Sequence, residues 1–334
     1  MEKAEEIDDR DVPSFKLLLA CPSGLSPSQV RSTATNRRST PQFVFPKISI
    51  NVTVKCEHLC KIKVSVHFDE SYDRIPHPDI DLENSISEIW DQRVQLSTSL
   101  FNGKKFRYGG HVFHGVIDPN QGSHVCLHLG LTDYRTFVGT NLSPLWDKFL
   151  AQSQDDCQQC QHTSSPLGNA AVVETSDKRI LVLQRSNMVG EFPGHFVFPG
   201  GHPEPEEVGT LSHLYDKDLT NAQLINRKVS QEMFDSIVRE VVEEIGVPAS
   251  SLCNPVFIGI TRRILNVRPA AFFFIKCSLP SKEIQQLYSS AQDGYESTKL
   301  YTVPVNEVES MASKMPGCHQ GGFALYKLMF HFSP

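Results

Sequence analysis

The chain has 334 residues, of which 40% are hydrophobic and 21% are charged, so it is long enough for about two globular domains. This composition excludes a wholly disordered chain and a collagen-like chain. With 32 basic and 38 acidic residues, the net charge is −6, which argues against a protein whose whole surface binds nucleic acid.

No segment has the features of a signal peptide or a membrane-spanning helix. The first residues are acidic, whereas a signal peptide begins with basic residues. The longest apolar stretch, 270–275, is as short as a strand, and a spanning helix needs about 20 residues. The nine cysteines are an odd number and indicate reduced thiols rather than disulfides. We therefore expect a cytoplasmic protein with no membrane partner.

The first predicted element is a strand over residues 13–22, and a helix could begin at Ser26. From 31 to 66 the chain has seven basic residues and one acidic residue. The second part of this stretch, 44–55, has the composition of a strand. We interpret residues 32–65 as an unstructured insertion. The alternative is a basic arm that binds a partner.

Regular structure begins near residue 81, and a polar stretch without periodicity, 153–165, separates two parts of the chain. The elements expected before it are a helix over 82–97, strands over 104–116 and from 124 onwards, and a short helix over 145–152. We therefore predict an N-terminal α+β region of residues 1–152, a linker of 153–165, and a second domain of 166–334.

The second part of the chain alternates strands with a few helices, which is typical of an α/β domain. The predicted strands cover 170–175, 179–186, 255–265, 268–279 and 298–305. The predicted helices cover 230–245, 281–288 and 321–332.

The helix of residues 230–247 carries a cluster of acidic side chains. Its apolar residues recur with helical spacing and form one stripe, and Gly246 is a good helix end. Glu240, Glu243 and Glu244 lie on the remaining surface, where the second and third are one turn from the first. Clustered like charges weaken a helix unless a cation lies between them, and divalent ions such as Mg²⁺ prefer carboxylate oxygens. The alternative is a solvated acidic face.

A glycine pair lies upstream of this helix, in FVFPGGHPEPEE at 196–207, where it would let the backbone approach a ligand closely. Together the two segments resemble the nudix hydrolase family, whose pattern is G-x5-E-x7-R-E-U-x-E-E-x-G-U, with U an aliphatic residue. Gly201 and Glu207 fit the first part, and residues 239–247 fit the second. The departure is the spacer of 31 residues, 208–238, where the pattern has seven. We expect the 24 extra residues, which include 212–228, to form a surface loop.

The resemblance implies an α/β/α sandwich with a mixed sheet, preceded by the smaller α+β region. It also implies metal-dependent hydrolysis of a nucleoside diphosphate linked to another group, with Mg²⁺ or Mn²⁺. By the same resemblance, Glu240 and Glu244 are metal ligands, Glu243 is a ligand or the catalytic base, and Glu207 is a further ligand. Arg239 is expected to orient the carboxylates rather than to contact the substrate.

Three segments, 100–110, 129–141 and 200–206, resemble the UDP-sugar diphosphatase branch of this family. Its members hydrolyse UDP-glucose and UDP-galactose to UMP and the sugar 1-phosphate, and their N-terminal region contributes to the nucleotide pocket. The expected substrate-binding residues are Phe101, Tyr134, Arg185, Gly190, Gly200 and Gly201. The two rings could stack on uracil or could be core residues.

Arg185 ends a predicted strand and could clamp a phosphate, or it could be an ordinary surface arginine. The expected partner is a small nucleotide sugar, with no nucleic acid and no membrane. The alternatives are a diphosphatase of ADP-ribose or a dinucleotide, and a non-catalytic nudix protein that binds a nucleotide. The sequence gives no indication of the oligomeric state.

Overall fold

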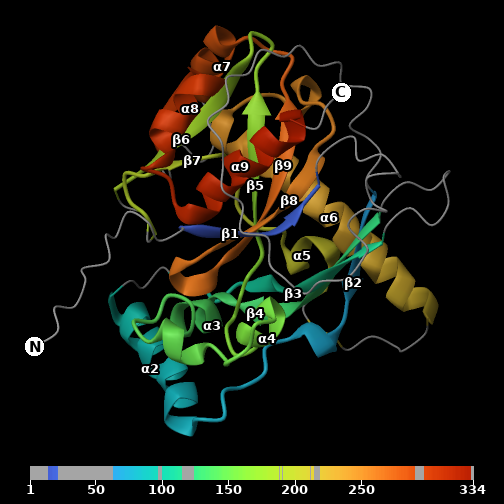
Figure 1. The fold of residues 1–334 in the computed structure, drawn as a ribbon, viewed down its shortest axis with the longest axis vertical. Helices are drawn as coiled ribbons and strands as arrows, with labels where there is room; N and C mark the ends of the chain where they lie inside the picture. Colours follow the sequence, from blue (N-terminus) through green and yellow to red (C-terminus); the bar gives the residue numbers. More distant parts are fainter. Residues whose placement is uncertain are drawn as a thin grey trace, which may run out of the picture.

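The computed structural model describes residues 14–21, 63–96, 100–114, 124–187, 189, 191–210, 212–213, 219–289 and 297–331. The helix predicted from Ser26, the strand-like stretch 44–55 and Gly190 lie outside these residues. The described chain contains two sheets, one of seven strands and one of three, with helices packed against them (Figure 1).

The large sheet is mixed, with the strand order β1-β8-β9-β5-β6-β10 and β7 paired to β6. Strand β5 runs parallel to β9, whereas the other paired strands are antiparallel. The strands are β1 (Phe15–Ala20), β5 (Gly168–Glu174), β6 (Arg179–Arg185), β7 (Phe196–Val197), β8 (Val256–Arg263), β9 (Pro269–Lys276) and β10 (Ser297–Pro304).

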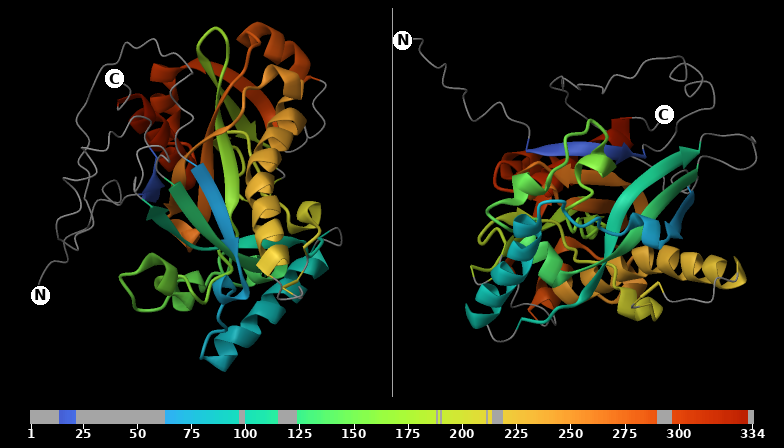
Figure 2. Two further views of the ribbon diagram at one scale, coloured as in Figure 1. Left: turned by 90° about the vertical axis from the view of Figure 1, so that its right-hand side faces the viewer. Right: turned by 90° about the horizontal axis from the view of Figure 1, so that it is seen from below.

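Helices cover both faces of this sheet (Figure 2). Helices α6 (Leu219–Ile245) and α7 (Ser281–Tyr288) pack on one face, and α8 (Val305–Ala312) and α9 (Gly317–His331) pack on the other. Neighbouring residues of β9 alternate between the two apolar clusters, as the pleat of a strand requires. The predicted α/β/α sandwich with a mixed sheet is therefore confirmed.

The small sheet consists of β2 (Lys63–Phe68), β3 (Lys104–His114) and β4 (His124–Asp133). The central strand β4 pairs parallel with β2 and antiparallel with β3. The remaining helices are α2 (Ile80–Leu96), α3 (Tyr134–Gly139), α4 (Asp156–Gln159) and α5 (Pro205–Val208), with 3₁₀ turns at Glu70–Tyr72, Trp146–Phe149, Ala249–Ser251 and Leu265–Val267.

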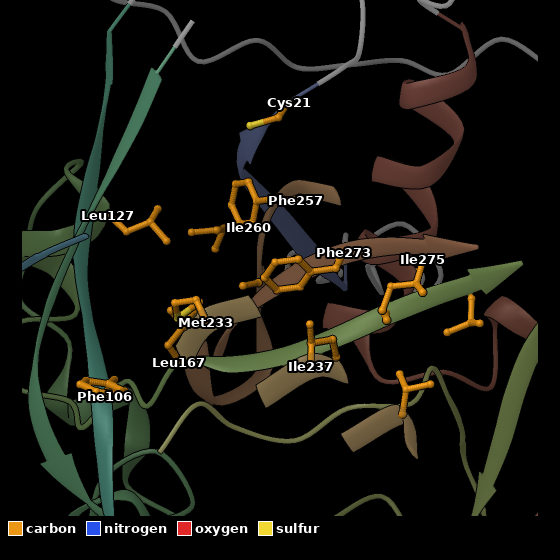
Figure 3. Close-up of a cluster of buried hydrophobic side chains, with 14 of the residues drawn as sticks. Cys21, Phe106, Leu127, Leu167, Met233, Ile237, Phe257, Ile260, Phe273 and Ile275 are labelled. Atoms are coloured by element: carbon orange, nitrogen blue, oxygen red, sulfur yellow. The ribbon is translucent and has the colours of Figure 1, made fainter. Parts of the chain in front are cut away.

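One apolar cluster joins the two sheets through helix α6 (Figure 3). Phe106 and Leu127 come from the small sheet, Ile237 comes from α6, and Phe273 comes from the large sheet. Each of these four side chains is fully buried, so burying their apolar surface contributes to a common core. The small sheet is consequently packed against helix α6 and the large sheet.

Three elements differ from the sequence prediction. Strand β1, predicted in the N-terminal region, pairs with β8 at the edge of the large sheet. Strand β2 begins at Lys63, so the last residues of the predicted insertion 32–65 belong to a paired strand. Helix α6 begins at Leu219 rather than near Ser230, so part of the spacer that we expected to be a surface loop is helical.

The polar segment 153–165, predicted as a linker, packs tightly against the small sheet. Arg107, which is only 4% exposed, donates to the carbonyl oxygens of Thr163 at 3.2 Å and Cys160 at 3.0 Å. It also donates to Tyr72 O at 2.8 Å. Burial lowers the pKa of this guanidinium to about 10, so it stays charged while it binds these carbonyl groups.

The seven cysteines within the described residues are all free thiols. No described helix is long and apolar enough to cross a membrane.

Candidate active site

The glycine loop after β7 lies directly against the acidic face of helix α6. The Gly200 N–H donates to Glu244 Oε2 at 2.8 Å, and the His202 N–H donates to Glu240 Oε1 at 3.1 Å. Ile237, Val241 and related apolar side chains on the opposite side of the helix are fully buried and hold it in place. The structure thus brings together the two sequence segments that carry the family pattern.

Gly201 is required by the close approach of this loop to the helix. A Cβ atom built on Gly201 would lie 1.8 Å from Glu240 Oε1 and 2.3 Å from its Cδ. At Gly200 the nearest atom would be Asn169 O, at 2.2 Å. Any larger residue at either position would therefore displace a carboxylate or the neighbouring strand.

Asn169 on β5 connects three parts of the site. Its Oδ1 accepts from the Gly201 N–H at 3.0 Å, and its own N–H donates to Gly201 O at 3.0 Å. Its Nδ2 donates to Ser236 Oγ on α6 at 2.8 Å. Sequence reasoning missed this residue because an asparagine in an apolar strand carries no recognisable motif.

Arg239 pairs with Glu232, a buried acidic residue seven positions earlier on the same helix. Arg239 Nη2 donates to Glu232 Oε1 at 2.8 Å, and that oxygen also accepts from the Glu204 N–H at 3.0 Å. Burial by itself would lower the pKa of Arg239, but the hydrogen bond and charge of Glu232, together with Glu207 and Glu204, raise it. Glu232 therefore joins the start of α5 to α6, and Arg239 pairs with Glu232. That Arg239 orients the proposed metal-binding carboxylates stays a prediction.

The four predicted metal ligands differ in their placement. Glu240 and Glu244 face the glycine loop, Glu243 is half-buried, and Glu207 is exposed on α5. Within the described residues, no group of three or more His, Cys, Asp or Glu side chains could hold a metal ion. Mg²⁺, however, needs only one or two protein carboxylates, because waters and substrate phosphates complete its coordination. The pair Glu240 and Glu244 fits that requirement.

A group of arginines borders the glycine loop and was only partly foreseen from the sequence. Arg268 Nη2 lies 2.9 Å from His202 Nε2, and both Arg268 and Arg263 pair with Glu191. Arg185, the predicted phosphate clamp, donates from Nε to the backbone oxygen of Glu191 at 2.9 Å. Arg262 and Arg263 end β8, and Arg268 comes directly before β9. Because the ends of adjacent strands lie together, this spacing could have predicted a cluster of arginines.

Phe101 and Tyr134 lie on neighbouring segments of the N-terminal region. The Tyr134 N–H donates to Gly103 O at 3.0 Å. Phe101 is 74% exposed, which excludes a core role for this ring. Tyr134 is half-buried and meets Trp90 edge to face, with ring centroids 6.0 Å apart. The two rings therefore differ in how much of their surface is available to a ligand.

A cavity of about 380 Å³ lies between the small sheet and the residues that follow α5. Its lining is mostly polar and includes Arg74, Lys104, Thr132, Asp133 and His213. This volume is in the range of small-molecule sites. Neither Phe101 nor Tyr134 lines it, although the cavity includes the residue next to Tyr134.

Sequence relatives of the chain are nudix proteins. It is similar to Nudix hydrolase 9 of Arabidopsis thaliana, with 56% identity over 334 residues that cover 98% of this chain and 95% of the relative. It is also similar to the uridine diphosphate glucose pyrophosphatase NUDT22 of Mus musculus, with 31% identity over 269 residues that cover 80% of this chain and 84% of the relative. The Homo sapiens protein of the same name is 30% identical over 271 residues, which cover 80% and 86% of the two chains. No protein-family model matches the chain.

Solved structures with similarity to the chain include a MutT protein from Methanosarcina mazei, with a TM-score of 0.31 and 17% identity over 48% of this chain and 91% of that one. A nudix hydrolase from Alicyclobacillus acidocaldarius has a TM-score of 0.31 and 14% identity over 50% of this chain and 92% of that one. The relationship therefore rests on the sequence relatives.

Proposed function

The chain belongs to the nudix hydrolase family, and we propose that it hydrolyses a UDP-sugar, UDP-glucose or UDP-galactose, to UMP and the sugar 1-phosphate. The observation that carries the hydrolytic part is the pair of carboxylates, Glu240 and Glu244, held by backbone amides of the glycine loop. The choice of substrate is supported by the relatives that are named as UDP-glucose pyrophosphatases, which align with 80% of this chain.

Glu240 and Glu244 would hold Mg²⁺ or Mn²⁺ in this mechanism. When bound, the cation supplies neutralisation of the diphosphate charge and makes a coordinated water more acidic. The amides of Gly200 and His202 fix one oxygen of each carboxylate, which defines where the ligand oxygens lie before the substrate arrives. Glu243, half-buried one turn along, is the candidate to accept the proton of the attacking water.

The polar cavity beside the small sheet is the proposed location for the non-phosphate part of the substrate. Its arginine, lysine, threonine and aspartate side chains can bind sugar hydroxyl groups, which both donate and accept hydrogen bonds. Lys105, next to Lys104 in the lining, donates to Glu204 Oε1 at 3.0 Å, immediately before α5. This contact joins strand β3, whose first residue lines the cavity, to the start of α5.

Turnover of UDP-glucose, ADP-ribose and NADH, each with and without Mg²⁺, tests the proposal. We expect metal-dependent release of UMP from UDP-glucose at the highest kcat/KM of the three. Glu240→Gln and Glu244→Gln should each nearly abolish turnover and weaken Mn²⁺ binding, because each removes a charged ligand oxygen and keeps the side-chain shape.

Three outcomes would contradict parts of this proposal. Preferred turnover of ADP-ribose or NADH would leave the hydrolase intact and refute the UDP-sugar substrate. Tight nucleotide binding without turnover of any of the three would favour a non-catalytic binding protein. Full turnover in both glutamine variants would refute the assignment of the metal ligands.

A further inference from the structure

A carboxylate is held between two guanidinium groups at the border of the glycine loop. Arg263 Nη2 donates to Glu191 Oε1 at 2.8 Å, and Arg268 Nη1 donates to Glu191 Oε2 at 2.6 Å. The side chain of Glu191 is 18% exposed and that of Arg263 is 3% exposed. Such short, charge-assisted contacts from two planar groups are also the geometry by which arginines bind a phosphate.

This ion cluster adjoins the metal-binding carboxylates that we propose. Arg268 Nη2 lies 2.9 Å from His202 Nε2, and the backbone N–H of the same histidine donates to Glu240. A Cβ atom built on Gly168 would lie 3.5 Å from Arg268 Nη2 and 3.6 Å from Gly201 O. The Arg268 guanidinium and the Gly201 carbonyl group therefore both lie beside Gly168. A diphosphate bound at Glu240 and Glu244 would consequently have Arg268 beside it.

The backbone around Glu191 is held in an unfavourable conformation by the same arginines. Phe192 has a φ of 50°, in the left-handed region that a non-glycine residue rarely adopts. The Arg263 guanidinium lies over its ring, 4.5 Å from the centroid, and Arg185 Nε binds the Glu191 carbonyl at 2.9 Å. Strain of this kind persists where surrounding contacts enforce it, and it is commonly found at ligand sites.

The cluster retains positive charge even with Glu191 in place. Three arginines, Arg185, Arg263 and Arg268, act on one carboxylate. Burial and then these three charges lower the pKa of the nearby His319 to about 3. One carboxylate carries a single negative charge, whereas a diphosphate carries two and offers more acceptor oxygens. A diphosphate therefore matches the donors of this cluster better than Glu191 does.

We infer that Arg263 and Arg268 form the subsite for one phosphate of the substrate, and that the Glu191 carboxylate occupies this subsite in the free enzyme and leaves when the substrate binds. This inference rests on the proposed nucleoside diphosphate hydrolysis. In this arrangement Glu191 keeps the buried Arg263 and the half-buried Arg268 paired, and burying Arg263 without a partner would be costly. It also lowers the apparent affinity for substrate by the fraction of enzyme in which the subsite is filled.

Variants of Glu191 and Arg268 distinguish two possible roles of the Glu191 carboxylate. It could compete with the substrate, or it could only support the fold. Glu191→Gln keeps the side-chain shape and removes its charge, so the KM for UDP-glucose should fall about threefold to tenfold. Arg268→Gln should raise KM at least tenfold. The double variant should gain less from loss of the Glu191 charge than the single variant does, because Arg263 alone still binds this carboxylate once Arg268 is lost.

Asp156→Asn is the matched control. Asp156 also bridges two cations, with Lys16 Nζ at 3.3 Å and Arg262 Nη2 at 2.8 Å, and its side chain is 16% exposed. Its loss should lower the melting temperature and leave KM unchanged. The same KM change in Asp156→Asn and Glu191→Gln would mean that loss of any bridging carboxylate is responsible, and would overturn the inference.

Calorimetric binding of inorganic pyrophosphate in the presence of EDTA tests the subsite independently of turnover. We expect Glu191→Gln to bind pyrophosphate more tightly than the unmodified protein and Arg268→Gln to bind it more weakly. An unchanged or weakened affinity in Glu191→Gln would overturn the inference. If UDP-glucose is not hydrolysed but pyrophosphate binding responds as expected, the proposed substrate fails and the phosphate subsite stands.

Discussion

Replacing Gly201 with alanine is a direct test of how the glycine loop and helix α6 form the proposed catalytic site. The added Cβ would lie 1.8 Å from Glu240 Oε1, whereas ordinary van der Waals contact begins at about 3.4 Å. The oxygen must therefore move by more than 1 Å. The colliding atoms belong to the end of a flexible side chain, so the carboxylate should shift while the backbone stays in place.

The expected effect falls mainly on kcat. A displacement of about 1 Å in a catalytic group can reduce the rate about 100-fold, which corresponds to about 2.7 kcal/mol of transition-state stabilisation. Loss of the hydrogen bond from the His202 N–H to the carboxylate should also cost about 1.5–3 kcal/mol of folding stability. Steady-state hydrolysis of UDP-glucose with Mg²⁺ and thermal unfolding on the same preparation measure the two effects.

Gly209→Ala provides the control for a general loss of stability. Gly209 ends α5 with a φ of 75°, and a Cβ there would meet no atom within 4 Å. The substitution should therefore cost about 1 kcal/mol of backbone strain and leave kcat within a factor of two or three. If Gly201→Ala retains kcat to the same degree as Gly209→Ala, the close approach of Gly201 to Glu240 has no catalytic role and the reasoning is refuted.

Three further predictions follow from the structure. Phe101→Ala should raise the KM for UDP-glucose about tenfold and leave the melting temperature unchanged, because the ring is 74% exposed. Tyr134→Ala should raise KM and also lower the melting temperature, because this ring packs against Trp90. A normal KM in both variants would exclude these rings from the site. The pKa of His319 is lowered to about 3, so between pH 6.5 and 3 the unfolded state binds a proton that the folded state does not. As the pH is lowered through that window, the free energy of unfolding should decrease by up to about 1.4 kcal/mol per pH unit. His319→Gln should reduce this slope, which urea unfolding at several pH values measures. Deletion of residues 32–58 should keep the melting temperature within a few degrees and retain activity. Deletion of 32–65 should destabilise the protein, because it removes part of the paired strand β2. Equal melting temperatures of the two deletion variants would contradict a stabilising role of β2.

The elements that the sequence could predict are those whose signals are local. The apolar stripe around Ile237 and Val241 predicted the helix and its buried face, and Gly246, with a φ of 81°, ends it as expected. The apolar run of β9 predicted a strand, and the structure shows this strand to be buried on both faces. The glycine pair and the carboxylates of α6 were identified together because the family pattern contains both.

The parts that could not be predicted depend on contacts between distant residues. Asn169 reaches the site only because β5 lies beside the glycine loop, and Glu232 on α6 accepts from the backbone N–H of Glu204, 28 positions away. The pairing of Glu191 with Arg263 and Arg268 joins residues more than 70 positions apart. No periodicity or spacing in a single sequence encodes such pairs, because they depend on the order of strands in the sheet.

The spacer that departs from the family pattern shows how an insertion can extend a catalytic helix. Residues 219–229 lengthen α6 toward the small sheet, where Asn226 Oδ1 accepts from the Phe68 N–H at 2.8 Å. Asn226 and Glu240 are fourteen residues apart, and at about 1.5 Å per residue a straight helix separates them by about 21 Å. Because a helix is stiff over that length, the small sheet and the carboxylates are held at a fixed distance. A flexible loop would let the distance between the nearby cavity and the proposed metal site vary. A helical insertion fixes that distance, which favours binding of a substrate that contacts both.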